Sequence, residues 1–338
     1  MKYNTPQTWK RLTAAIALCA LLTGCATAPV AAPAEETVVE TTAMDDVVEC
    51  VEMLDIDLGI VPLSATPAVS TVLMPVASGT TVYSNAKAYI DASHTADGYV
   101  MIKSLEITTA DIKVVVTGPS GVAYYYSLAG DGSFEVFPLS DGNGNYLFQI
   151  CKNATGTSYS VSYSTYIPVT LKDQFAPFLL PNQYVNYTAD SQAVAQAATL
   201  TAGKTTEVEK IKAVYNYVVA NLTYDNVRAA TVTSGYLPDI DAVLTEKKGI
   251  CFDYAALMTA MLRSQGVPCK LVVGNAGTAY HAWISVYTAN QGWLDGVIYF
   301  DGVTWELMDP TFASGGVTST TISSYINSGT YYTAKYLY

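Results

Sequence analysis

The spacing of the apolar residues changes midway along this 338-residue chain, and that change constrains the fold more than any other feature. From residue 64 to residue 172, short β-branched and aromatic runs alternate with turn sequences such as Gly118-Pro119-Ser120-Gly121. Regularly spaced runs of strand length without a helical period are typical of antiparallel sandwiches. We therefore predict an all-β, immunoglobulin-like sandwich over residues 64–172. Its strands are expected at 112–117, 122–127, 134–137, 146–151 and 159–166.

A helical spacing replaces the strand spacing in the second half of the chain. Thr206 and Glu209 match a capping box, and a stripe of apolar residues follows on one helical face: Val208, Ile211, Val214, Tyr215, Val218 and Leu222. A second helix is expected from Cys251 to Gln265. Strands are expected at 269–273, 280–287, 293–300 and 303–308, with Asp301-Gly302 as a hairpin turn. Helices packed on an antiparallel sheet predict an α+β domain over residues 185–315, which leaves 316–338 as a C-terminal extension.

The N-terminal residues 1–24 have the pattern of a secretory signal. A basic start precedes an apolar run from Leu12 to Leu22, which is too short to cross a bilayer of roughly 30 Å as a permanent helix. The sequence Leu22-Thr23-Gly24-Cys25 resembles the lipidation site of bacterial lipoproteins, which implies that Cys25 becomes the lipid-bearing first residue. Residues 25–48, rich in Ala, Pro, Thr, Val and Glu, are predicted to be a flexible tether. We expect the mature chain in the cell envelope, anchored to a membrane and facing outward.

The composition indicates a folded, acidic protein. Hydrophobic residues make up 50% of the chain and charged residues only 14%, which leaves ample material for a packed core. Removing residues 1–24 takes away three basic residues and no acidic ones, so the formal charge moves from −12 to −15. Such a charge makes nucleic acid a poor partner. The expected partners are a peptide or protein substrate and, through Cys25, a membrane.

Four cysteines remain outside the predicted signal and lipidation site: Cys50, Cys151, Cys251 and Cys269. In an oxidising envelope a Cys50–Cys151 disulfide would tie the first domain to the segment before it, but spacing alone leaves this open. No cysteine pair has the spacing of a zinc knuckle, and the only two histidines lie far apart. The sequence therefore predicts no metal site and no cofactor.

Three residues in the predicted α+β domain have the chemistry of a nucleophile, a base and an orienting carboxylate. Cys251 is expected at a helix start, where unpaired backbone N–H groups favour the thiolate form of a cysteine. His281 would exchange protons with the substrate and Asp309 would hold the imidazole in the useful tautomer. We predict a catalytic triad of these three residues. The backbone N–H of Cys251 is a candidate oxyanion donor, and the sequence does not identify a second one.

Three aromatic residues near the predicted triad are weaker candidates for substrate binding. Tyr254 follows Cys251 within one helical turn, Trp283 shares a strand face with His281, and Trp305 shares one with Asp309. The alternative is that all three are core residues. A buried cysteine that serves only as a small apolar residue is likewise the alternative for Cys251.

These segments together resemble the transglutaminase-like superfamily of papain-type thiol enzymes. The resemblance rests on Gly249-x-Cys251-x-Asp253-Tyr-Ala, on Gln265 to Lys270 after the helix, on His281-Ala-Trp283, and on Trp305 with Asp309-Pro-Thr. It covers roughly residues 185–315 and implies a papain-like core with the cysteine on a helix and the histidine and aspartate on adjacent strands. The N-terminal half shows no such resemblance.

The nucleophile segment departs from that of transglutaminases proper, which carry Gly-Gln-Cys-Trp where this chain has Gly249-Ile-Cys251-Phe. No acidic, glycine-containing calcium loop is visible either, which argues against calcium-dependent cross-linking. Bacterial and archaeal members of the superfamily are expected to be peptidases or amidases. We therefore expect a thiol hydrolase that works through an acyl-enzyme. Acyl transfer that cross-links proteins and a non-catalytic surface binding protein are the alternatives, and the sequence indicates neither the substrate nor the oligomeric state.

Overall fold

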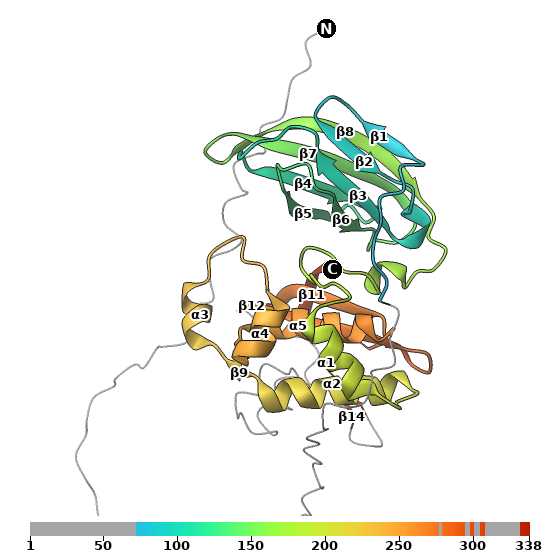
Figure 1. Cartoon of the computed structure of the whole chain (residues 1–338), viewed down its shortest axis with the longest axis vertical. Coiled ribbons are helices and arrows are strands. Elements are labelled where there is room, and N and C mark those ends of the chain that lie inside the picture. The colour runs from blue at the N-terminus through green and yellow to red at the C-terminus, as the bar shows by residue number, and fades with distance from the viewer. Residues whose placement is uncertain (1–71, 277–278, 295–297, 301–304, 308–331) are drawn as a thin grey trace, which may run out of the picture. The chain divides into compact units, whose positions relative to one another are not determined.

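The computed structural model describes residues 72–276, 279–294, 298–300, 305–307 and 332–338 (Figure 1). These residues fall within one compact unit. The predicted signal peptide, Cys25, the tether and Asp309 lie outside the described residues. Within the described ranges, no helix is both long enough and apolar enough to cross a membrane.

The N-terminal domain consists of two four-stranded antiparallel sheets (Figure 1). The first sheet has the order β1 (Val82–Ser84), β2 (Ala88–Asp91), β3 (Tyr99–Ser104) and β6 (Glu135–Pro138). The second has the order β5 (Ala123–Leu128), β4 (Ile112–Thr117), β7 (Gly144–Thr155) and β8 (Ser158–Val169). The predicted all-β fold is confirmed. Strand β4 has the predicted bounds, whereas β7 and β8 extend beyond theirs and β1 to β3 had no expected counterpart.

The sandwich core follows from strand alternation. In β4, Ile112, Val114 and Val116 are buried while the residues between them are half-buried, because successive side chains point to opposite faces of a sheet. Ile90 and Ile102 of the other sheet are fully buried in the same cluster. Each such side chain contributes about 1.5–3 kcal/mol when removed from water.

In the described part of the C-terminal domain, five α-helices precede the main sheet in the sequence. They are α1 (Gln192–Thr201), α2 (Glu207–Asn221), α3 (Asn226–Thr231), α4 (Ile240–Glu246) and α5 (Cys251–Ser264). The predicted capping box of α2 is confirmed, because the Thr206 side chain accepts from Glu209 N while Glu209 Oε2 accepts from Thr206 N at 3.1 Å. Helix α5 begins at Cys251, as predicted.

The antiparallel sheet of this domain has the order β13 (Gly292–Leu294), β12 (Ala279–Thr288), β11 (Cys269–Ala276) and β16 (Tyr332–Leu337). Two small pairs lie outside it: β14 (Ile298–Phe300) with β15 (Trp305–Leu307), and β9 (Thr223–Tyr224) in parallel with β10 (Lys248–Gly249). The strand expected over 293–300 is therefore two strands in different sheets. Strand β16, which belongs to the segment interpreted as an extension, completes the main sheet.

Helix α5 packs on β11 and β12 (Figure 1). The Sγ atom of Cys269 donates to Thr259 Oγ1 at 3.5 Å, so the face of β11 that carries Cys269 is the one turned toward α5. Strand pairing places Val286 opposite Cys269, and alternation continues this face along β12 through Ile284 and Ala282. The predicted packing of a helix on an antiparallel sheet is thus confirmed.

The buried Arg263 joins the end of α5 to segments distant in sequence. Its guanidinium donates to three carbonyl oxygens, those of Leu180 at 2.6 Å, Cys269 at 2.8 Å and Tyr338 at 2.6 Å. Burial lowers the pKa of this arginine. The guanidinium of Arg263 therefore joins three distant parts of the chain: the segment after the sandwich, the start of β11 and the residue after β16.

Candidate active site

Cys251 is the first residue of α5, and its side chain is nearly enclosed, with an exposed fraction of 7%. Ile250 before it is extended, with φ −97° and ψ 176°, so the chain turns sharply into the helix at this point. The carboxylate of Asp253 reaches back and accepts from the backbone N–H of Ile250 at 2.8 Å. This bond stabilises the first turn of α5 and so fixes the backbone position from which the Cys251 side chain extends.

Asp253 is fully buried, and two further donors satisfy its carboxylate. The Tyr236 hydroxyl donates to Oδ1 at 2.5 Å and Arg228 Nη1 donates to Oδ2 at 3.3 Å. A buried carboxylate is stable only when it is paired and hydrogen-bonded in this way. Gly249 makes room for it, because a Cβ atom at that position would lie 2.6 Å from Asp253 Cβ. Close packing against Asp253 thus explains why position 249 of the Gly249-x-Cys251-x-Asp253 pattern is a glycine.

Arg228 connects this carboxylate to the neighbouring elements. Its Nη2 donates to Glu246 at 3.1 Å, and its backbone N–H donates to Asp225, the N-cap of α3, at 2.8 Å. The backbone N–H of Asp225 in turn donates to Gly249 O at 2.8 Å beside the β9–β10 pair. Burial and the hydrogen bond to Asp253 raise the pKa of Tyr236, which therefore remains a neutral donor at physiological pH.

His281 lies on β12 opposite Gly274 of β11 and is also only 7% exposed. Its ring stacks with Trp283 at a centroid distance of 6.2 Å and lies 6.2 Å from the ring of Tyr332 on β16. A side chain at Gly274 would lie 2.0 Å from the carbonyl oxygen of Thr333, so glycine allows β16 to approach closely. Aromatic rings from two strands therefore orient the imidazole.

Tyr280 relates the strand that carries His281 to the thiol. Pairing with Asn275 and strand alternation place Tyr280 on the face of β12 turned toward α5, while His281 is on the face with Trp283. Burial, with smaller contributions from Tyr336, Tyr184 and Cys251, raises the pKa of Tyr280 to about 12. The thiol is thus among the groups that influence Tyr280, whereas strand alternation places His281 on the other face of β12. A contact between Cys251 and His281 stays part of the predicted triad.

The remaining predicted site residues fall in different places. Tyr254 is fully buried in the core, and its part in substrate binding stays a prediction. Trp283 is 5% exposed and serves mainly as the ring beside His281. Trp305 is the first residue of β15 and pairs with Phe300. Its side chain is not among those that the structure describes. Asp309 lies outside the described residues, so its place in a triad stays a prediction.

Two cysteines behave as buried structural thiols. Cys269 is fully buried, and burial raises its pKa to about 11, which keeps the thiol protonated at physiological pH. Cys151 is a free, buried thiol, and because Cys50 lies outside the described residues, a disulfide between them stays an open prediction. Among the residues that the structure describes, no three His, Cys, Asp or Glu side chains gather to hold a metal ion.

Sequence reasoning missed the residues that hold the nucleophile segment. Arg228 and Tyr236 carry no local signal, because each lies in an ordinary short helix or loop and gains its role only through Asp253. Tyr332 was overlooked because its segment was interpreted as an extension. Asp253 was the exception, since an acidic residue in the first turn of a helix is a recognisable stabilising feature.

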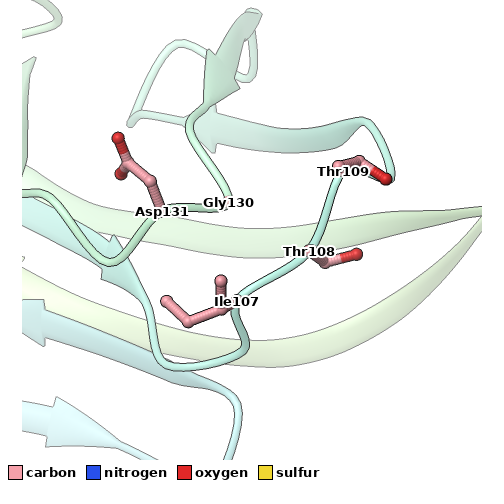
Figure 2. A pocket seen from close by; sticks show the side chains of 5 residues that line it. All are labelled: Ile107, Thr108, Thr109, Gly130 and Asp131. Atoms are coloured by element: carbon pink, nitrogen blue, oxygen red, sulfur yellow. The ribbon is translucent and has the colours of Figure 1, made fainter.

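A hollow on the sandwich lacks the chemistry of this site. It has a volume of about 590 Å³ and is lined by Ile107, Thr108, Thr109, Gly130 and Asp131 (Figure 2). Thr108 N donates to Gly130 O at 2.8 Å beneath it, and Ile107 is 77% exposed. Asp131 is its one ionisable lining residue, so the hollow contains no nucleophile and no base.

Residues 194–295 match the family model described as the transglutaminase-like superfamily. A 105-residue segment is 28% identical to the uncharacterized protein YebA of Bacillus subtilis (strain 168), covering 25% of this chain and 14% of that protein. The chain thus spans only a small part of this relative. The match to the family model confirms, over residues 194–295, the resemblance seen in the sequence.

Solved structures show a distant likeness to this chain. The periplasmic domain of TgpA from Pseudomonas aeruginosa is 14% identical, with a TM-score of 0.33 over 64% of this chain and 94% of that one. A candidate cysteine protease from Cytophaga hutchinsonii is 18% identical, with a TM-score of 0.31 over 63% and 71% of the two chains. At these values the likeness carries no argument about activity.

Proposed function

We propose that this chain, whose residues 194–295 carry a transglutaminase-like core, is a thiol hydrolase that cleaves amide bonds of peptides or proteins. One observation carries the proposal: Cys251 is the first residue of a buried helix whose start is held by Asp253, Arg228 and Tyr236. A nucleophile benefits from such support, because a small misplacement of the attacking atom slows the reaction greatly.

The proposed reaction has two steps. The thiolate of Cys251 attacks the amide carbonyl carbon, the C–N bond breaks, and protonated His281 gives its proton to the leaving amine. This step leaves a thioester on Cys251. A water molecule then loses a proton to His281 and attacks the thioester, which releases a carboxylic acid and restores the thiolate together with protonated His281. In this proposal Asp309 orients the imidazole, and the backbone N–H of Cys251 donates to the oxyanion.

We further propose that the enzyme acts outside the cytoplasm, held on a membrane by a lipid on Cys25 and spaced from it by residues 25–48. The signal-like residues 1–24 and the Leu-Thr-Gly-Cys25 sequence support this placement. Its substrates would then be peptides or proteins of the envelope or its surroundings. Nucleic acid is not an expected partner of a chain this acidic.

Acyl transfer is the second candidate, favoured by the enclosure of the site. Cys251 and His281 are each 7% exposed, and a thioester shielded from water survives longer for attack by an amine. In that reaction an amine nitrogen replaces the water oxygen in the second step, and two proteins become joined. The first step and the role of Cys251 are unchanged.

Mass spectrometry of a defined peptide and protein mixture, incubated with the enzyme and a primary amine, tests both candidates. Products that gain water and disappear with Cys251→Ala would establish hydrolysis, and amine adducts that disappear would establish transfer. Cys151→Ala is the matched control, because that buried thiol lies in the sandwich. The proposal is wrong if Cys251 of the folded protein is alkylated no faster than an ordinary exposed thiol at pH 7.

A further inference from the structure

Three side chains of the sandwich domain, Ser78, His94 and Asp97, form a chain of hydrogen bonds. Ser78 Oγ lies 2.5 Å from His94 Nε2, and His94 Nδ1 lies 2.9 Å from Asp97 Oδ2. We call these three residues the sandwich triad. The order hydroxyl, imidazole, carboxylate, with Nε2 toward the hydroxyl and Nδ1 toward the carboxylate, is the order in which serine nucleophiles are activated on unrelated folds.

The bond to Asp97 determines which nitrogen of His94 can accept a proton. The hydrogen bond from His94 lowers the pKa of Asp97, against a smaller opposing effect of burial, so this carboxylate is charged at neutral pH and can only accept. Nδ1 of His94 is therefore the donor in this pair, which leaves Nε2 of the neutral ring as an acceptor. The Ser78 hydroxyl then donates to Nε2, in the direction in which a general base removes its proton.

A single turn of 3-10 helix brings the imidazole and the carboxylate together. His94 precedes the 3-10 helix Thr95–Asp97, and the backbone N–H of Asp97 donates to His94 O at 2.9 Å. Side chains three residues apart in such a turn lie on the same side. Lys172 Nζ donates to the other oxygen of Asp97 at 3.3 Å, and the ring of Tyr99 stacks on His94 at a centroid distance of 5.1 Å. Lys172 and Tyr99 thus hold the carboxylate and the imidazole in place.

Hydrogen bonds on both sides of Ser78 hold the segment that carries it. The buried carboxylate of Asp91 accepts from the backbone N–H of Gly79 at 2.6 Å. On the other side, the Tyr99 hydroxyl accepts from Val76 N at 3.1 Å. Ser78 itself is exposed. The sandwich triad therefore combines a fixed position of the hydroxyl with access from solvent, and both are needed for a nucleophile to react.

The backbone that follows Ser78 limits the kind of substrate. The N–H of Gly79 is bonded to the buried carboxylate, and those of Thr80 and Thr81 donate to Ser93 Oγ at 2.9 and 3.0 Å. These N–H groups can stabilise an oxyanion only by giving up a bond, and the loss of one such donor slows acyl transfer by about 10²–10³-fold. An ester whose leaving group departs as a stable anion tolerates this loss better than an amide does. The sandwich triad therefore suits activated esters.

We propose that the sandwich triad is a second nucleophilic site, in which Ser78 takes the acyl group of an activated ester such as an aryl ester. Ser78 Oγ attacks the carbonyl carbon, its proton passes to His94 Nε2, and the bond from the carbonyl carbon to the leaving oxygen breaks, which releases an aryloxide anion. The imidazolium gives its proton to solvent. A water molecule then loses a proton to His94 and attacks the acyl-serine, the carboxylic acid departs, and the imidazolium returns the proton to Ser78 Oγ.

The test uses the full chain with Cys251→Ala, which removes the thiol chemistry, and a fluorophosphonate probe that labels activated serine hydroxyls. Mass spectrometry of peptides locates the label. We expect Ser78 to be labelled about tenfold faster or more than Ser133, an exposed serine whose hydroxyl is bonded to Asp131 with no imidazole between them. 4-Nitrophenyl acetate measures turnover through the release of 4-nitrophenolate, and Ser78→Ala should reduce that release to the background rate.

Variants separate a base from a mere hydrogen-bond partner. In His94→Gln the amide oxygen can still accept from Ser78 but takes up no proton, so labelling of Ser78 should fall by about a hundredfold. Asp97→Asn should reduce it by about tenfold, because an amide no longer requires Nδ1 to be the donor. Asp97→Asn also covers the case in which His94→Gln does not fold, which urea unfolding detects. Ser133→Ala is the matched control and should leave the labelling of Ser78 unchanged.

The outcomes decide between a reactive site and a structural one. Equal labelling of Ser78 and Ser133, or labelling of neither, would overturn the inference. An unchanged labelling rate in folded His94→Gln or Asp97→Asn would overturn it as well, and would show that the three residues only fasten the segment before β1 to the sandwich. Because Cys251 is replaced throughout, these results do not depend on the proposed thiol chemistry, and the two sites can fail separately.

Discussion

The carboxylate of Asp253 accepts a hydrogen bond from the backbone N–H of Ile250, the residue before the thiol, at 2.8 Å. Because Asp253 is fully buried, this bond is protected from exchange with water. It links the position of the thiol to a carboxylate that is itself held by Tyr236 and Arg228. Several elements therefore determine the geometry of the nucleophile segment. Single substitutions can remove the contribution of each element in turn.

Asp253→Asn should slow alkylation of Cys251 and reduce Cys251-dependent turnover by about tenfold. An amide oxygen can still accept from Ile250, but the amide lacks the charge that pairs with Arg228, and although Arg228 keeps its pair with Glu246, weakening the bonds of a fully buried group costs about 1–3 kcal/mol. The measurement is the iodoacetamide rate of the folded variant at pH 7. Asp239→Asn is the matched control, because Asp239 caps α4 with a bond to Ala242 N at 3.0 Å and lies away from the thiol. Equal rates in both variants would contradict the prediction.

Tyr236→Phe tests the hydroxyl alone. The ring contact with Phe252, at 6.3 Å, should survive, while Asp253 loses its shortest hydrogen bond. We expect kcat to fall severalfold with little change in KM, and the unfolding free energy to fall by about 1–2 kcal/mol. Tyr159→Phe removes a hydroxyl bonded to Asp111 on the sandwich and should leave kcat unchanged. A KM effect without a kcat effect in Tyr236→Phe would place the residue in substrate binding instead.

Arg263→Met should destabilise the protein strongly. The methionine fills part of the same volume but leaves the carbonyl oxygens of Leu180, Cys269 and Tyr338 without their donor, which costs about 3 kcal/mol or more in unfolding free energy. Urea unfolding measures the loss. Lys172→Met serves as the comparison, since that cation is 75% exposed and its pair with Asp97 contributes about 1 kcal/mol or less. Similar losses of unfolding free energy in the two variants would show that the three hydrogen bonds of Arg263 do not stabilise the protein as predicted.

The unfolding free energy should fall as the pH rises from about 9 toward 11. Burial raises the pKa of Cys269 to about 11 from an ordinary value of 9.0, so above pH 9 the unfolded chain loses this proton while the folded chain keeps it. The contribution is therefore fully present below pH 9 and is lost as the pH rises through the folded pKa. Urea unfolding at several pH values measures the slope, which Cys269→Ala should reduce. An unchanged slope in the variant would assign the effect to other groups.

The sequence by itself determined the features that depend on near neighbours along the chain. The alternation of Ile112, Val114 and Val116 was enough to define β4, and Thr206 with Glu209 was enough to define the start of α2. The start of α5 at Cys251 and the likeness of the C-terminal domain to a thiol-enzyme family were also predictable. Each of these signals lies within a few residues, because capping bonds and strand alternation are local.

Only the tertiary structure decided which distant segments meet. It placed β16 beside β11, divided the expected strand over 293–300 between two sheets, and buried Tyr254 in the core. It also brought Tyr236 to Asp253, across a loop with no pattern of its own. The physical reason is that burial and pairing between remote segments depend on the whole packed arrangement, and periodicity in one segment does not specify its partner.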